Sequence, residues 1–261
     1  MDNTDTTHTL KAVLFDVDGT LADTERDGHR PAFNAAFKEF ELSWNWDIPL
    51  YGELLQVTGG KERIRFYIEK YQPDELKRND LDEWIASLHK TKTRHFKQLM
   101  EQGEIPLRPG VKRLVRELRD RNVRVAIATT TTPENVTYLL ESTLGSHASN
   151  FFDVIGAGDI VPQKKPAPDI YYWVLGQLQL KPSQCIAIED SEHGLNAALA
   201  AGLPTVITVN HYTAQQNFSG AATVLSDLGE PDQAFTVLSD SPEMKDQQFV
   251  DVDVLEKLLV K

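Results

Sequence analysis

The sequence predicts a doubly wound α/β protein, in which helices cover both faces of a parallel sheet and a helical domain is inserted after the first strand. Short apolar segments alternate with segments of helical periodicity along most of the chain, and this alternation is typical of a parallel sheet. The segment between the first two strands has roughly a hundred residues and reads as helices. The 261 residues suffice for one to two domains that each bury a core.

The strands are expected in short apolar segments, because a strand buried on both faces reads as a continuous apolar run. Five such segments are Lys11–Phe15, Val123–Ala128, Phe152–Ile155, Cys185–Ile188 and Thr205–Val209. The tail, Gln248–Lys261, is expected to add a last short strand and a helix.

Helical patterns separate these strands. They lie at Val111–Leu118, after Thr132, at Ile170–Leu178 and at Leu195–Ala201. Thr132 followed by Pro133 predicts a helix with threonine as its N-cap and proline in its first position. Gly202 and Pro204 end the last of these patterns before the fifth strand.

The inserted segment has its own helices and its own aromatic residues. Helices are expected at Pro31–Leu42, Lys61–Tyr71 and Asp80–Glu101, and the aromatic side chains among them are enough for a small separate core. The sequence therefore predicts a helical cap domain at residues 23–106, and an α/β core domain formed by residues 1–22 and 107–261.

The charge and the composition exclude several classes of partner. The formal net charge of −12 argues against binding to nucleic acid or to an anionic membrane. No apolar run approaches the roughly 18 residues of a membrane span. The single cysteine, Cys185, excludes an internal disulfide, and the polar, acidic start lacks the arginines of a targeting peptide. We expect a monomer that acts on a small molecule in the cytoplasm, or in the plastid stroma as a mature chain.

Chemically useful side chains follow the predicted strands. They are Asp16 and Asp18 after the first strand, Thr129 after the second, Lys165 before a helix, and Glu189 and Asp190 after the fourth strand. In an open α/β sheet, ligands bind beyond the carboxyl ends of the strands. Each residue has an ordinary structural explanation by itself, such as a turn or a helix cap. Their joint occurrence at successive strand ends predicts a single site.

These segments resemble a known family. The sequences DVDGTL, KKPAPD and EDS, with the strand-end Thr129, resemble in this order the four motifs of the haloacid dehalogenase superfamily. The helical insertion resembles its small cap, and the core its Rossmann-like fold. Five further segments resemble the CbbY group of sugar-bisphosphate phosphatases within it: Thr24–Arg30, Tyr51–Leu55, Thr58–Arg63, Leu88–Thr93 and Leu107–Val111. The resemblance implies hydrolysis of xylulose-1,5-bisphosphate, a rubisco misfire product and inhibitor in the Calvin cycle, to xylulose 5-phosphate.

Phosphoryl transfer requires a nucleophile, a proton donor and positive charge around the phosphoryl oxygens. Asp16 is the candidate nucleophile, which would form an aspartyl phosphate, and Asp18 is the candidate general acid and base. Mg²⁺ prefers oxygen ligands, so the Asp16 and Asp190 carboxylates and the Asp18 carbonyl are expected to hold it. Glu189 is expected either as a ligand or beside one. Thr129 and Lys165 are expected to hold the phosphoryl oxygens.

A substrate with two phosphates requires a second cationic site. The candidate substrate-binding residues are Lys61, Arg63 and Lys92 for the distal phosphate, Glu25 and His29 for sugar hydroxyls, and, in the core, Thr130. For two of them an alternative stays open, since Lys92 could lie on a solvated helix face and His29 could serve only in packing or capping.

Three other functions remain open. A β-phosphoglucomutase-like phosphomutase would keep the same motifs and differ in the lifetime of its phosphoenzyme. A non-catalytic regulator that binds sugar phosphates would have no use for both Asp16 and Asp18. A phosphoglycolate-type monophosphatase would leave the cap cations without a role.

Overall fold

The computed structural model describes residues 9–57 and 59–259, and the chain divides into two compact units. Met1–Asp23 and Pro106–Lys261 form one unit, here called the core, and Thr24–Ile105 forms the other, here called the cap. These bounds differ by one residue from the expected ones. Thr58 of the motif segments, and the last two residues of the predicted tail, lie outside the described residues.

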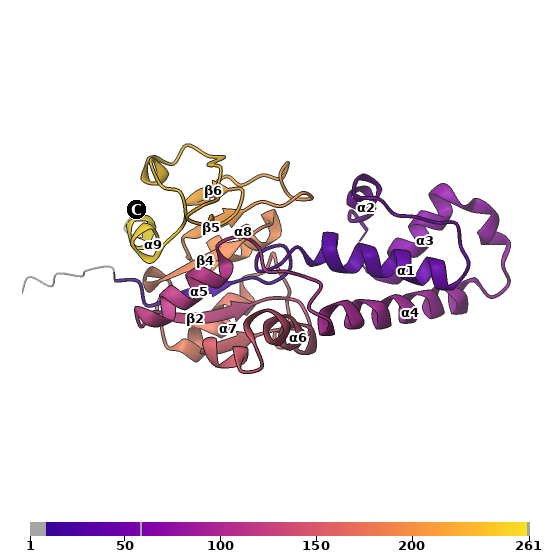
Figure 1. The fold of residues 1–261 in the computed structure, drawn as a ribbon, viewed down its shortest axis with the longest axis horizontal. Coiled ribbons are helices and arrows are strands. Elements are labelled where there is room, and N and C mark those ends of the chain that lie inside the picture. The colour runs from indigo at the N-terminus through magenta and orange to yellow at the C-terminus, as the bar shows by residue number, and fades with distance from the viewer. Residues whose placement is uncertain (1–8, 58, 260–261) are drawn as a thin grey trace, which may run out of the picture. The chain divides into compact units, whose positions relative to one another are not determined.

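The core contains a parallel sheet with the strand order β3-β2-β1-β4-β5-β6 (Figure 1). Its strands are β1 (Ala12–Phe15), β2 (Arg124–Ala128), β3 (Val154–Gly156), β4 (Cys185–Glu189), β5 (Thr205–Thr208) and β6 (Thr223–Leu225). Phe15, the last residue of β1, pairs in register with Ile127 of β2 and with Ile188 of β4. The strand order reverses direction between β1 and β4, and a doubly wound sheet binds ligands at such a switch point. The predicted fold class is confirmed.

Helices pack on the sheet through alternating strand residues. They are α5 (Val111–Asp120), α6 (Pro133–Leu144), α7 (Asp169–Leu178), α8 (Glu192–Ala200) and α9 (Val252–Leu259). Ala12 and Leu14 of β1 belong to a buried cluster with residues of α7 and α8. The intervening Val13 and Phe15 are also fully buried, as the apolar run predicted. The predicted cap of α6 is confirmed, because the Thr132 hydroxyl accepts a hydrogen bond from the backbone N–H of Asn135.

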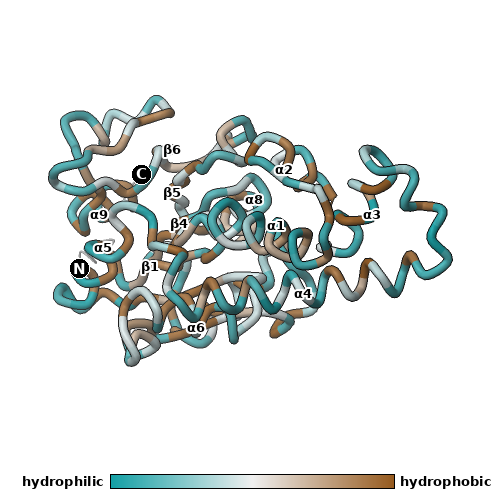
Figure 2. Tube along the Cα trace, turned by 45° about the vertical axis from the view of Figure 1, so that its right-hand side comes forward, coloured by the Kyte–Doolittle hydropathy of each residue, from teal (hydrophilic) through white to brown (hydrophobic). Residues whose placement is uncertain are grey.

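The cap is helical and has its own core. Its helices are α1 (Arg30–Glu39), α2 (Ile48–Leu54), α3 (Gly60–Tyr71) and α4 (Leu81–Glu101), and a π-helical turn at Thr24–His29 precedes them. In Figure 2, α4 alternates between brown and teal, as expected for a helix with one buried face. Trp46 is completely buried among aromatic rings, with Phe33 at 4.6 Å and Phe37 at 4.9 Å between ring centroids. This cluster is the core that the aromatic residues predicted.

The structure differs from the expected elements in three places. Helix α2 was missed, although Asp47 caps its Leu50 N–H at 2.9 Å. Strand β6 was missed because its three residues are too few for a pattern. The last strand, expected within 248–261, is wrong: in the described part of that segment, α9 follows a turn, and Val250 donates a backbone hydrogen bond to Leu228. Over the described residues, no helix is both long and apolar enough to cross a membrane.

Candidate active site

Side chains from three separate segments meet at the carboxyl end of the sheet. Asp16 follows β1, Glu189 ends β4, and Lys165 lies in the loop before α7. The ammonium group of Lys165 donates to Oδ1 of Asp16 at 2.7 Å, to Oε1 of Glu189 at 2.6 Å and to the carbonyl of Ala128 at 2.7 Å. The side chains of Lys165 and Asp16 are only 8% and 10% exposed. The structure thus places these three predicted residues in one buried cluster.

The cluster carries more negative than positive charge. Burial raises the pKa of Asp190 well above its ordinary value, and the neighbouring Asp16 and Glu189 carboxylates raise it further. Burial also raises the pKa of Glu189. For Lys165, burial opposes the charge, but the carboxylates of Asp16 and Glu189 outweigh it and raise the pKa, so this side chain stays protonated at neutral pH.

A hard divalent cation suits this cluster. Among the described residues, Asp16, Glu189 and Asp190 offer carboxylate oxygens that all lie within 4.8 Å of one another. Mg²⁺ and Ca²⁺ bind such all-oxygen sites, and a cation would offset the repulsion that raises the pKa of Asp190. The donor set therefore fits the magnesium ion that the sequence predicts.

The carboxylate of Asp190 is held from two sides. The side-chain amide of Asn210 donates to its Oδ2 at 2.6 Å. Gly19, which has a φ of +85°, packs its backbone so closely that a Cβ atom there would overlap Asp190 and Asn210. Asn210 was not predicted, although it lies one residue after the strand expected at Thr205–Val209, where the rule of strand ends could have indicated it.

Glu189 is engaged by groups other than a cation. Its Oε1 accepts hydrogen bonds from Lys165 and, at 2.6 Å, from the phenol of Tyr171. Its Oε2 faces the backbone of Gly194 so closely that a Cβ atom there would overlap it. Between the two expectations for Glu189, these contacts favour a supporting position beside the ligands. Tyr171 was not predicted, because its role depends on a partner that is distant in the sequence.

The threonine run after β2 contacts Asp18. The Thr131 hydroxyl donates to the Asp18 carboxylate, and the Thr131 N–H donates to the hydroxyl of the buried Thr129 at 3.3 Å. Thr130, the predicted substrate residue, is exposed. Sequence reasoning named Thr129 and Thr130 but missed Thr131, although all belong to the same run of hydroxyls.

In the cap, Arg63 and Glu25 share a tyrosine. The Tyr51 hydroxyl donates to Oε2 of Glu25 at 2.5 Å and accepts from the Arg63 guanidinium at 2.9 Å. The guanidinium also donates to the carbonyls of Leu54 and Val57, both at 3.3 Å. Arg63 is buried, so it holds the chain between α2 and α3 in place besides any contact with substrate.

His29 and Lys92 form a second pair in the cap. The Lys92 ammonium lies 2.8 Å from Nδ1 of His29, whose ring stacks on Phe96 with 3.9 Å between centroids. Lys92 is 7% exposed, so the alternative of a solvated helix face is wrong for it. Burial lowers the pKa of His29 well below its ordinary value, and Lys92 and Arg63 add to the effect. A neutral His29 that accepts at Nδ1 carries its proton on Nε2.

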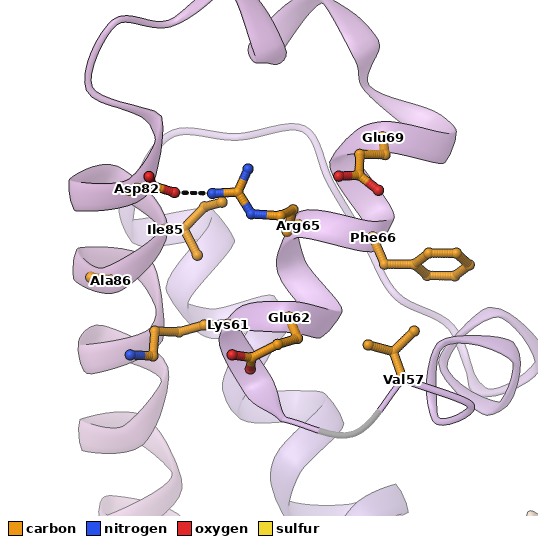
Figure 3. Close-up of a pocket in the computed structure, with 9 residues that line it drawn as sticks. All are labelled: Val57, Lys61, Glu62, Arg65, Phe66, Glu69, Asp82, Ile85 and Ala86. Carbon is orange, nitrogen blue, oxygen red and sulfur yellow. Dashed lines mark hydrogen bonds and ion pairs between the residues drawn. The ribbon is translucent and has the colours of Figure 1, made fainter.

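Lys61 is exposed at the start of α3, where it borders a pocket of about 470 Å³ between α3 and α4 (Figure 3). The charged residues of the pocket have both signs, and Arg65 pairs with Asp82 across it. The pocket therefore lacks the excess positive charge of a phosphate site. Burial lowers the pKa of His89, and the charges of Lys92 and Lys61 lower it further, so these cations act on one region of the cap.

Comparison with known proteins shows the family to which the chain belongs. The family model "haloacid dehalogenase-like hydrolase" matches residues 10–202. Protein CbbY from the plasmid of Cupriavidus necator is 48% identical over 222 residues, which cover 85% of this chain and 87% of that protein. The crystal structure of CbbY from Rhodobacter sphaeroides in complex with phosphate has a TM-score of 0.70 and 44% identity, and the match covers 84% of this chain and 95% of that one.

A mutant of the Rhodobacter sphaeroides protein, crystallised in complex with xylulose-(1,5)bisphosphate, matches with a TM-score of 0.69 and 43% identity over the same shares of the two chains. The family model covers β1 through β4 and the cap, and the relative from Cupriavidus necator covers most of the chain. The chain therefore belongs to the haloacid dehalogenase-like hydrolases and, within them, to the CbbY proteins.

Proposed function

We propose that this protein is a Mg²⁺-dependent phosphatase that removes one phosphate from a sugar bisphosphate through an aspartyl phosphate on Asp16. The observation that carries the proposal is the buried pair of Asp16 and Lys165 beside Glu189 and Asp190, at the switch point of the sheet. The first candidate substrate is xylulose-1,5-bisphosphate, because a relative with 43% identity was crystallised with it. The product would be xylulose 5-phosphate.

The reaction uses two carboxylates in sequence. The Asp16 carboxylate attacks phosphorus, the bond to the sugar oxygen breaks, and Asp18 gives its proton to that oxygen. Asp18 then takes a proton from a water molecule, which attacks the aspartyl phosphate and releases inorganic phosphate and free Asp16. Lys165 and Thr129 hold the phosphoryl oxygens as charge develops on them. Thr131, which donates to Asp18, orients the proton-transferring carboxylate.

The carboxylates of Asp16 and Asp190 and the backbone carbonyl of Asp18 would hold Mg²⁺, which would offset the negative charge of the phosphoryl group and of the acids around it. The side-chain amide of Asn210 donates to Oδ2 of Asp190 at 2.6 Å and so fixes the orientation of that carboxylate. Glu189 holds Lys165 in place and is itself held by Tyr171. These contacts orient the groups before substrate binds.

The cap would bind the distal half of the substrate. Lys61, Arg63 and Lys92 supply positive charge for the second phosphate. Besides burial, Lys92 and Arg63 lower the pKa of both His29 and His89, and Lys61 lowers that of His89, which supports a common positive region. The Glu25 carboxylate accepts hydrogen bonds, and the Nε2–H of a neutral His29 donates one. Both side chains therefore suit sugar hydroxyls. Thr130, exposed beside Thr129, completes the proposed contacts in the core.

A phosphate-release assay tests the proposal. Purified protein with Mg²⁺ is given ketose and aldose bisphosphates, their monophosphates and, as a counter-screen, ribulose-1,5-bisphosphate. We expect one phosphate per molecule of xylulose-1,5-bisphosphate, a much lower kcat/KM for monophosphates and ribulose-1,5-bisphosphate, and no release with a chelator. Equal turnover of all of these compounds would contradict a bisphosphate-specific enzyme.

The same assay separates the remaining functions. A phosphomutase would release phosphate slowly and would transfer it to a hexose 1-phosphate instead. A regulator would bind the sugar phosphate without releasing phosphate. Fast release without a bisphosphate activator would exclude both.

The proposed substrate forms where rubisco is active. We therefore propose that the protein acts in the same compartment as rubisco and the Calvin cycle, which is the cytoplasm or the plastid stroma. We also propose that it acts as a monomer. Light scattering of the purified protein would check this, because a dimer would have twice the mass of 29.4 kDa.

A further inference from the structure

Arg108 is a buried arginine of the core at which several loops of the active-site edge meet. It is 9% exposed and lies just after the point where the chain returns from the cap at Ile105. Its backbone N–H donates to the carbonyl of Leu21 at 2.8 Å, so it is tied to the segment that leads out toward the cap. The site described above assigns no function to this residue.

Both terminal nitrogens of the Arg108 guanidinium donate to backbone carbonyls. One terminal nitrogen donates to the carbonyl of Gly19 and, at 2.8 Å, to that of Thr208. The other donates to the carbonyl of Val209 at 2.5 Å and to that of Ser226 at 2.8 Å. Nε lies 3.4 Å from the carboxylate of Asp23, the last core residue before the cap. The guanidinium thus binds four backbone carbonyls through its terminal nitrogens and faces a carboxylate with Nε.

We propose that Arg108 is a positioning residue, which fixes the Gly19 turn against Asp190 and so sets the geometry of the magnesium site. This inference rests on the proposed function. Gly19 directly follows Asp18, whose backbone carbonyl is a proposed ligand, and its own backbone touches the Asp190 carboxylate. The guanidinium joins the Gly19 carbonyl to the ends of β5 and β6, which are parts of the rigid sheet.

A lysine could not do the same work. The ammonium group has three donors on a flexible stem, whereas the planar guanidinium reaches four carbonyls and a carboxylate in fixed directions. Replacing Arg108 with lysine would keep the charge near the site and release part of the bracing. The Arg108→Lys substitution therefore separates geometry from charge.

Arg113 of α5 provides a matched control. It also donates to two backbone carbonyls, those of Leu228 and Gly229, and it forms ion pairs with Glu117 and Glu230. None of these residues belongs to the Gly19 turn or to the carboxylate cluster. Arg113→Lys therefore removes a comparable set of structural contacts without a link to the site.

The experiment measures Mg²⁺ affinity by calorimetry, and kcat and KM by phosphate release, in the wild type, Arg108→Lys and Arg113→Lys. We expect Arg108→Lys to weaken Mg²⁺ binding and lower kcat by about ten- to a hundredfold, the range for residues that orient metal ligands. KM should change little, and Arg113→Lys should match the wild type in all three quantities. Wild-type Mg²⁺ affinity and kcat in a folded Arg108→Lys would overturn the inference.

If Arg108→Lys does not fold, the Asp23→Asn variant tests whether Arg108 positions the Gly19 turn. It removes only the charge that Nε faces, so we expect a folded protein whose Mg²⁺ affinity falls by a smaller factor in the same direction. Unchanged Mg²⁺ affinity in this variant would then refute the inference. Failure of the proposed function would show separately, as an absence of phosphate release by the wild type, since the calorimetric comparison needs no turnover.

Discussion

The Lys165 ammonium group lies 2.7 Å from Oδ1 of Asp16, although 149 positions separate the two residues in the sequence. The fold brings them together because Asp16 follows β1, and the loop between β3 and α7, which carries Lys165, reaches the same edge of the sheet. The same ammonium also binds Glu189, so one cation holds two of the three clustered carboxylates. A bound phosphoryl group would meet this cation directly beside the proposed nucleophile.

The roles proposed for Asp18 and Asp190 should be separable by mutation. Asp18→Asn should keep most of the Mg²⁺ affinity, because the proposed ligand is the backbone carbonyl. It should lower kcat by about 10²- to 10⁴-fold, the contribution of a general acid and base. Asp190→Asn should instead weaken Mg²⁺ binding strongly. Calorimetric Mg²⁺ titration of both variants tests this, and an equal loss of affinity would mean that the Asp18 carboxylate is itself a ligand.

The distal phosphate is best tested at Lys61. Arg63 and Lys92 are buried and bonded within the cap, so Arg63→Ala and Lys92→Ala would disturb the fold as well as the charge. Lys61 is exposed, and a charge-assisted hydrogen bond contributes about 1.5–3 kcal/mol. Lys61→Ala should lower kcat/KM for a bisphosphate about tenfold or more, with little effect on a monophosphate.

Lys90→Ala is the control for Lys61, because it removes the same charge from another exposed cap position. Its kcat/KM should stay at the wild-type value for both substrates. If Lys61→Ala reduces turnover of both substrates equally, Lys61 does not bind the second phosphate.

The free energy of unfolding should depend on pH through His29. Its pKa is lowered in the folded protein by burial and by the cations around it, so the unfolded chain binds a proton more readily. His29 therefore makes its full contribution to the free energy of unfolding above its unfolded-state pKa of about 6.5. This contribution is lost as the pH falls below that value. One proton limits the effect to about 1.4 kcal/mol per pH unit.

The measurement is the free energy of unfolding of the wild type minus that of His29→Gln, from pH 8 to pH 5. Glutamine keeps an acceptor for Lys92. The difference for His29→Gln should shrink as the pH falls. A difference independent of pH would show that His29 titrates normally.

The sequence predicted five of the six strands of the described chain and the major helices, because buried strands and amphipathic helices leave a periodic pattern. It missed α2, whose start is signalled only by Asp47 and Pro49, and β6, which is three residues long. The strand expected in the tail was wrong, because residues 248–251 form an irregular loop in which Val250 is buried without belonging to a strand. Short elements depend on their neighbours more than on their own pattern.

The candidate site was predictable where it consists of charged side chains at strand ends. The supporting residues were not, because their partners are backbone atoms or distant side chains. Arg108 binds four carbonyls, which have no signature in a sequence, and Tyr171 reaches Glu189 from 18 positions away. Lys92 could be placed on a helix but not on its buried face, because its burial depends on Phe33 and Phe96.

In the proposed reaction, Asp16 carries the phosphoryl group during turnover. The direct measurement is a rapid acid quench of enzyme mixed with Mg²⁺ and excess xylulose-1,5-bisphosphate, followed by mass spectrometry of the peptide that contains Asp16. We expect a peptide heavier by one phosphoryl group at Asp16 in the wild type. In Asp16→Asn we expect neither that adduct nor phosphate release, with an unchanged circular dichroism spectrum. Phosphate release by Asp16→Asn within about tenfold of the wild-type rate would contradict it, because a general loss of the nucleophile should cost far more.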